Sequence, residues 1–136
     1  MFKLGEVMSE SSANNLSPVV LAFVGDAVYN LFVRERLTFF SDSRTGELNR
    51  LATKEVKATA QAEFVQEILP ILTEKEISIF KRGRNSKKNT KAKNASIVEY
   101  NLSTGFEAVL GYLYLTGNYD RLNFILNKGI TNETWR

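Results

Sequence analysis

Two carboxylates stand in apolar stretches of the chain, and they are the residues best suited to carry out chemistry. Asp26 is the only charged side chain between positions 18 and 33, and Glu107 is the only one between positions 100 and 117. An ionised carboxylate in apolar surroundings is costly, so each needs solvent, a basic partner or a cation beside it. The common explanation is an acid that faces solvent or pairs with a basic side chain. The alternative is a metal site built from both carboxylates.

The residue types absent from the chain restrict that chemistry. The 136 residues include no cysteine and no histidine. This composition excludes a disulfide framework, a thiolate nucleophile, a Cys-ligated metal and any mechanism with a histidine base or ligand. Two carboxylates on closely crossing helices repel each other, and a divalent cation with oxygen ligands removes the conflict. Mg²⁺ fits best, because it takes one or two protein carboxylates and completes its shell with water and phosphate.

Helical spacing places other polar groups beside these carboxylates. Tyr29 and Asn30 follow Asp26 by three and four residues, and Thr104 precedes Glu107 by three. Residues at these spacings share a helix face, so their side chains could complete a metal shell through water. Small residues on the same segments would let two helices approach closely: Ala22, Gly25, Thr104, Gly105 and Gly111.

Hydrophobic periodicity predicts an all-α fold of six or seven helices, with no sustained strand pattern. Hydroxyl side chains at Ser17, Thr73 and Ser96 are typical N-caps, the last two followed by glutamate as in a capping box. The predicted helices cover 17–37, 47–69 with a possible break near Thr53, 73–81, 96–115 and 118–129. The length of 136 residues and 43% hydrophobic content suit one globular domain, 1–136, with a polar N-terminal segment at 1–15 and a basic loop at 81–95.

The basic loop concentrates the positive charge of the protein. Positions 81–93 hold seven Lys or Arg and no acid, so the remainder carries −4 although the whole chain carries +3. The loop contains no aromatic residue, which favours contact with the backbone of a duplex over stacking on single-stranded bases. A disordered basic linker is the alternative. The candidate RNA-binding residues in the loop are Arg82, Arg84, Lys87, Lys88, Lys91 and Lys93.

A second basic feature lies on the predicted helix 47–69. Arg50, Lys54, Lys57 and Gln61 are spaced so that they line one face of that helix, and the three basic residues are further candidates for RNA binding. A solvated helix face is the alternative.

Nothing in the sequence indicates a membrane or a secretory route. The first fifteen residues lack the apolar core of a signal peptide, and the longest apolar run, 19–24, falls far short of the roughly 20 residues that span a bilayer. We therefore expect a cytoplasmic protein with no membrane partner.

Two motifs resemble the ribonuclease III family. The string LAFVGDAV at 21–28 resembles the signature helix of that domain, and FEAVLGY at 106–112 resembles its second acidic motif. The basic string RGRN before the second motif resembles the Mini-ribonuclease III branch, which has no double-stranded-RNA-binding domain. The resemblance covers about residues 16–130.

This resemblance implies an activity and partners. It implies a homodimeric, Mg²⁺-dependent endoribonuclease that cleaves double-stranded RNA and leaves 5′-phosphate and 3′-hydroxyl ends. It also implies that Asp26 and Glu107 are the catalytic, metal-binding residues and that the signature helices lie near the dimer interface. The implied substrate is the precursor of the large-subunit (23S) ribosomal RNA, with a large-subunit ribosomal protein as a further partner.

The chain departs from the family pattern at two acidic positions. Ala22 stands where the family has a metal-linked glutamate, and Thr104 stands where it has an aspartate. The number of acids in the site thus falls from four to two, which predicts weaker or more substrate-dependent Mg²⁺ binding. Two other functions stay open: a catalytically silent RNA-binding module with the same fold, and a helical protein-interaction domain whose loop binds an acidic partner.

Overall fold

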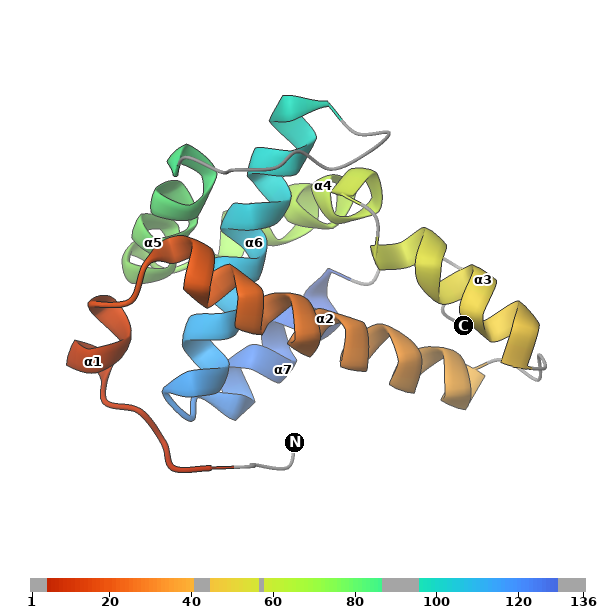
Figure 1. Cartoon of the computed structure of the whole chain (residues 1–136), viewed down its shortest axis with the longest axis horizontal. Helices are drawn as coiled ribbons and strands as arrows, with labels where there is room; N and C mark the ends of the chain where they lie inside the picture. Colours follow the sequence, from red (N-terminus) through yellow and green to blue (C-terminus); the bar gives the residue numbers. More distant parts are fainter. Residues whose placement is uncertain (1–4, 41–44, 57, 87–95, 130–136) are drawn as a thin grey trace.

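The computed structural model describes residues 5–40, 45–56, 58–86 and 96–129, and this part of the chain is helical without a strand (Figure 1). The all-α prediction is therefore confirmed. No helix in these ranges is both long and apolar enough to cross a membrane. The α-helices are α1 (Glu10–Asn14), α2 (Pro18–Phe40), α3 (Thr45–Val56), α4 (Ala58–Ile68), α5 (Glu74–Asn85), α6 (Ile97–Leu115) and α7 (Tyr119–Lys128), with a 3₁₀ turn at Leu69–Ile71.

Capping residues mark the starts of α5 and α6 and the end of α6, as the sequence predicts. Thr73 and Ser96 each form a capping box with the glutamate three residues later, at the starts of α5 and α6. Gly117, with φ of +75°, follows α6 in the left-handed conformation that glycine adopts without strain.

Three boundaries differ from the prediction. The polar segment 1–15 contains α1, whose N-cap Ser9 accepts a hydrogen bond from the backbone of Ser12 and whose Ala13 is buried. The stretch 47–69 is broken, as the sequence suggests, but the break follows Val56 rather than Thr53, and the stretch forms α3, α4 and a 3₁₀ turn. Helix α5 continues past the expected end near Lys81 to Asn85, so the basic loop begins later than predicted.

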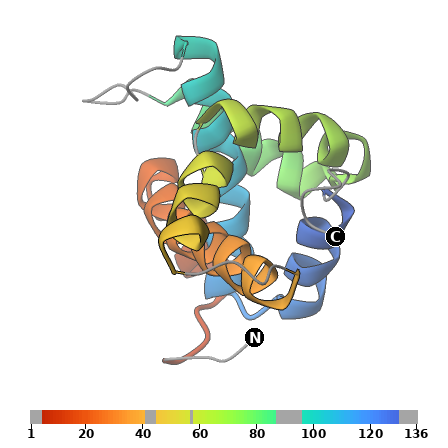
Figure 2. The ribbon, with the colours of Figure 1, turned by 90° about the vertical axis from the view of Figure 1, so that its right-hand side faces the viewer.

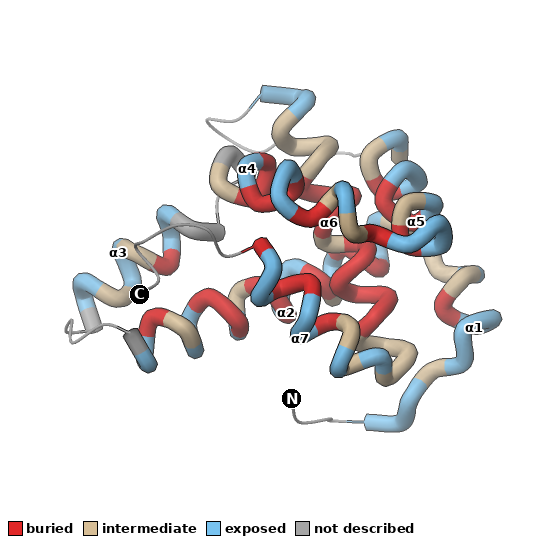
Figure 3. Tube along the Cα trace, turned by 180° about the vertical axis from the view of Figure 1, so that it is seen from behind, coloured by how far each residue is buried: buried red, intermediate tan, exposed pale blue. Residues whose placement is uncertain are grey.

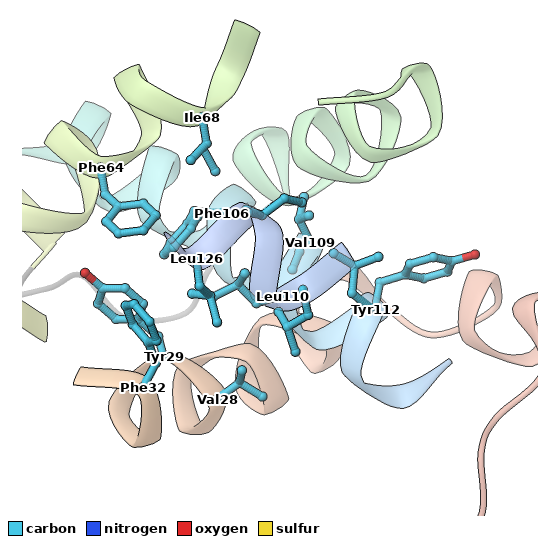
Figure 4. Packing of buried hydrophobic residues seen from close by; sticks show 14 of the residues in the cluster. Val28, Tyr29, Phe32, Phe64, Ile68, Phe106, Val109, Leu110, Tyr112 and Leu126 are labelled. Atoms are coloured by element: carbon cyan, nitrogen blue, oxygen red, sulfur yellow. The ribbon is translucent and has the colours of Figure 1, made fainter. Parts of the chain in front are cut away.

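Helix α6 lies in the middle of the molecule, and its central residues are buried (Figure 3). Helices α2, α4, α5 and α7 pack against it, with α2 and α4 on different sides (Figure 2). Aromatic side chains join three of these helices, because the ring of Tyr29 on α2 meets Phe64 on α4 edge-on at 5.6 Å and Phe106 on α6 at 5.2 Å (Figure 4).

A partly buried ion pair joins α7 to α5. Arg121 donates from Nε and Nη2 to both carboxylate oxygens of Glu76 at 2.8 Å, and from Nη2 to the carbonyl of Ile71 at 2.7 Å. Burial raises the pKa of Glu76, but hydrogen bonds from Arg121 and Thr73 outweigh it, so the pKa is below its usual value. This acid is therefore neutralised within the fold.

The crossing of α2 and α6 is a contact of backbone against backbone. A Cβ atom on Gly25 would lie 1.7 Å from the carbonyl oxygen of Glu107, and one on Gly111 would lie 1.9 Å from that of Leu21. Only hydrogen fits at both positions, as the small-residue pattern predicts. The crossing places Asp26, the residue after Gly25, beside Glu107.

Gly25→Ala should therefore destabilise the fold strongly. The added methyl would meet backbone atoms that cannot move without separating two core helices, so we expect a loss of about 3 kcal/mol or more in the free energy of unfolding. Gly46→Ala is the matched control, since a Cβ atom added at this position of α3 would have nothing within 4 Å. Urea unfolding should show the control unchanged or slightly stabilised. Equal midpoints for the two variants would contradict the close crossing.

Candidate active site

Asp26 and Glu107 meet where α2 crosses α6, because Gly25, the residue before Asp26, packs directly against the backbone of Glu107. Asp26 is exposed, whereas Glu107 is partly buried. No basic side chain forms a salt bridge with either carboxylate in the described part of the chain. The structure therefore brings together the two acids that the sequence singled out and does not pair them with a cationic residue.

Each carboxyl group has an amide neighbour. On α2, Nδ2 of Asn30 donates to the carbonyl oxygen of Asp26 at 2.9 Å and to its Oδ1 at 3.3 Å. From α4, Nε2 of Gln61 donates to Oε2 of Glu107 at 3.2 Å. Neutral donors orient both acids and leave the negative charge of the pair uncancelled.

The proximity of Asp26 affects the protonation of Glu107. Burial raises the pKa of Glu107, and the hydrogen bond and negative charge of Asp26 raise it further, while the amide of Gln61 lowers it. The resulting pKa is about 9. Without a cation, Glu107 therefore keeps its proton at neutral pH, and the repulsion between the acids is relieved in that way.

The donor set and its surroundings fit a hard divalent cation. Both side chains offer oxygen ligands, and the exposure of Asp26 leaves room for water and phosphate in the rest of a metal shell. Among the described residues, no group of three or more acidic, His or Cys side chains forms a metal-binding cluster. Such a cation would be held by two protein carboxylates, in agreement with the loss of acids at Ala22 and Thr104.

The three neighbours predicted from helical spacing have different surroundings. Asn30 contacts Asp26, as described above. Tyr29 is 1% exposed and belongs to the aromatic cluster. The hydroxyl of Thr104 donates to the carbonyl of Tyr100 at 2.9 Å, within its own helix. Asn30 is thus the predicted neighbour for which the structure gives a direct bond to a candidate ligand.

The candidate RNA-binding residues of the loop divide into two groups. Arg82 and Arg84 lie on the last turn of α5, on either side of Gly83, whose added Cβ would lie 2.9 Å from Cα of Gly105. The exposed Arg82 donates to the carbonyl of Leu16 at 3.4 Å. Because Gly83 packs against α6, both arginines are held near the helix that carries Glu107. The other four, Lys87, Lys88, Lys91 and Lys93, lie outside the described residues.

The basic stripe predicted on helix 47–69 is only partly recovered. Arg50 and Lys54 are exposed and line a shallow pocket on α3, where Arg50 also pairs with Glu47. Lys57 lies outside the described residues. Gln61 is not on this face: it is buried at 2% exposure and contacts Glu107. The helical spacing fails across the break between α3 and α4.

The sequence does contain a pattern that indicates the burial of Gln61. It precedes Phe64, Val65 and Ile68 at spacings of three, four and seven, and these residues form the buried face of α4. A glutamine on that face must find a polar partner in the interior.

Comparison with known proteins agrees with this fold and site. Residues 19–118 match the family model of the ribonuclease III domain, and the chain belongs to the ribonuclease III family. Several proteins named Mini-ribonuclease 3 are among its relatives. The one from Clostridium tetani is 46% identical over 124 residues, covering 90% of this chain and 82% of that protein. The one from Streptococcus pneumoniae is 47% identical over 116 residues, covering 84% and 91%.

A solved structure has the same arrangement. The X-ray structure of a Fusobacterium nucleatum protein superposes with a TM-score of 0.74 at 29% identity, and the match covers 83% of this chain and 90% of that one. Family membership defines the chain as an endoribonuclease that acts on double-stranded RNA, in a family that generally depends on divalent metals and typically dimerises. The helical protein-interaction domain and the silent RNA-binding module are not the functions that the family supports.

The raised pKa of Glu107 predicts a pH dependence of stability in EDTA. An unfolded glutamate loses its proton near pH 4.5, whereas the folded one keeps it up to about pH 9. The unfolded state therefore binds fewer protons between these values, and stability falls as pH rises through this window. We expect the resulting loss in the free energy of unfolding to reach roughly 2 to 4 kcal/mol by pH 8.

Glu107→Gln isolates this contribution because an amide does not titrate. Urea unfolding at pH 5 to 8 in EDTA should show a flatter pH profile for the variant, which becomes the more stable protein at pH 8. Parallel profiles would show that Glu107 ionises with an ordinary pKa.

Proposed function

We propose that this protein is an Mg²⁺-dependent endoribonuclease of the cytoplasm, with Asp26 and Glu107 as its metal-binding catalytic residues. The observation that carries the proposal is the meeting of the two carboxyl groups at the α2–α6 crossing, with no salt bridge to a basic side chain among the described residues. Such a pair must hold a proton or a cation. Mg²⁺ at this position suits a reaction at a phosphate, because it accepts phosphate oxygens beside the carboxylates.

The reaction is the hydrolysis of a phosphodiester. Bound Mg²⁺ supplies an activated water and stabilises negative charge on the phosphate and the leaving oxygen. Water attacks phosphorus and loses a proton, the bond to the 3′ oxygen breaks, and that oxygen takes up a proton, so the products carry a 5′-phosphate and a 3′-hydroxyl. Asp26 is the exposed member of the pair and faces the RNA, while Asn30 orients it and Glu107 completes the site from α6.

An exposed apolar stripe on α2 supports a homodimer. Val20, Phe23, Ala27 and Leu31 follow one another at spacings of three and four and all are exposed, with Phe23 at 79%. A stripe of this kind on a surface helix is typical of a protein interface. A second copy packed on it would border Asp26, so that each protomer could cut one strand of a duplex.

The basic residues supply contacts to the RNA backbone. Arg82 and Arg84 begin this surface at the end of α5, and Arg50 and Lys54 on α3 contribute exposed charge. Lys57 and the lysines of the loop extend both groups. The resemblance of the chain to Mini-ribonuclease III favours the precursor of 23S ribosomal RNA as the substrate, bound with a large-subunit ribosomal protein.

Asp26→Asn should abolish cleavage and leave the fold and RNA binding intact. The amide keeps the shape of the side chain but removes a charge that the cation needs, so the rate should fall at least about a hundredfold. The assay incubates a long RNA duplex with the protein in Mg²⁺ and, separately, in EDTA. Asp120→Asn, an exposed position on α7, is the control and should cleave normally. Cleavage by Asp26→Asn in Mg²⁺ at the wild-type rate would overturn the assignment.

Removing the basic charges should weaken binding and flatten its dependence on salt. A variant with alanine at Arg82, Arg84, Lys87 and Lys88 releases fewer counterions, so the slope of log affinity against log salt should fall by about 0.9 for each lost phosphate contact. Filter binding of a duplex in EDTA at several salt concentrations measures it. Lys128→Ala, exposed at the end of α7, should keep the wild-type slope. An unchanged slope in the fourfold variant would exclude phosphate contacts from this segment.

A further inference from the structure

Gln61 is buried and contacts the candidate site from a different helix. Its side chain is 2% exposed, and its Nε2 donates to Oε2 of Glu107 at 3.2 Å. The two residues are 46 positions apart in the sequence, so the bond joins α4 to α6.

The other buried polar residues in the described part of the chain have partners of a different kind. Glu76 pairs with Arg121. The hydroxyls of Ser103 and Thr104 both donate to the carbonyl of Tyr100, one turn earlier in the same helix. These bonds satisfy polar groups within the fold. The bond from Gln61, by contrast, ends on the carboxyl group of Glu107, at the crossing that brings Glu107 beside Asp26.

The surroundings of Gln61 hold its amide in place. Phe64, one turn later on α4, packs against Tyr29 at 5.6 Å and against Phe106 at 5.1 Å between ring centres (Figure 4). Phe106 directly precedes Glu107. The aromatic cluster therefore fixes α4 relative to the stretch of α6 that carries the acid, and the amide is fixed with it.

A neutral amide is the appropriate donor for this position. Glutamate has three rotatable side-chain bonds, and one hydrogen bond from a rigid neighbour removes much of that freedom. A lysine or arginine would orient the acid equally well, but its positive charge would compete with a cation for the same carboxylate. Glutamine orients Glu107 and leaves its charge available.

We propose that Gln61 is a positioning residue, whose amide holds the Glu107 carboxyl in the orientation that faces Asp26 and binds the divalent cation. This inference rests on the proposed metal site. Position 61 lies outside the two motifs that contain Asp26 and Glu107, and neither motif assigns it a role. Outer partners that orient metal ligands commonly affect metal affinity by 10- to 100-fold when removed.

The test compares Gln61→Met and Gln61→Asn with a matched control. Methionine is similar in size but cannot donate, and asparagine keeps the amide but is one methylene too short to reach. Gln66→Met makes the same exchange at an exposed position of the same helix. Mn²⁺ binding by isothermal titration, without RNA, measures the site directly, and thermal unfolding in EDTA measures the fold.

We expect both Gln61 variants to bind Mn²⁺ roughly tenfold or more weakly. They should also need a correspondingly higher Mg²⁺ concentration for half-maximal cleavage, while duplex binding in EDTA and all properties of Gln66→Met stay as in the wild type. A lower unfolding temperature with unchanged Mn²⁺ affinity would show a structural role only and overturn the proposal. If Gln61→Met does not fold, the same comparison is made with Gln61→Asn.

Asp26→Asn in the same titration separates the two proposals. If Asp26→Asn loses Mn²⁺ binding and the Gln61 variants keep it, the metal site stands and the positioning role of Gln61 is wrong. If neither change affects Mn²⁺ binding, the cation is not held at Asp26 and Glu107, and the positioning role fails together with the proposed site.

Discussion

The approach of α2 to α6 at Gly25 and Gly111 is the constraint on which the rest of the structure depends. With hydrogen in place of a side chain at both positions, each helix rests on the carbonyl oxygens of the other. The short separation between α2 and α6 determines how the aromatic cluster fills the space beside the crossing. It also makes Asp26 and Glu107 neighbours. Fold and site thus have one geometric origin, and a change that separates the helices alters both.

Bringing two acids together creates an electrostatic problem, and the way it is solved indicates the chemistry. A fold that needed Glu107 only for packing could neutralise it with an arginine, as Arg121 neutralises Glu76. At the α2–α6 crossing the neighbours are amides, from Asn30 and Gln61. These neutral amides fix the orientation of the acids without cancelling their negative charge. The site is therefore suited to an exchangeable positive charge, which is what a metal-dependent nuclease requires.

The sequence predicts those features that depend on local spacing. Capping boxes at Thr73 and Ser96 mark the starts of α5 and α6, and the small residues on two apolar segments predict the close crossing. Spacing counted from Arg50 places Gln61 on the exposed basic face, which is wrong. The periodicity does not continue through the break between α3 and α4, where the direction of the chain changes. The reach of its amide to α6 depends on how α4 packs, and no spacing within the sequence reports that.

Helix α2 carries both the exposed apolar stripe and Asp26, which lies beside Ala27 in the middle of that stripe. A surface that covers the stripe must end at the carboxylate or come very close to it. Any partner that binds there changes the access of water and phosphate to Asp26. The state of assembly and the reactivity of the acidic pair are therefore linked through a single helix, and the cleavage rate per protomer is expected to depend on protein concentration.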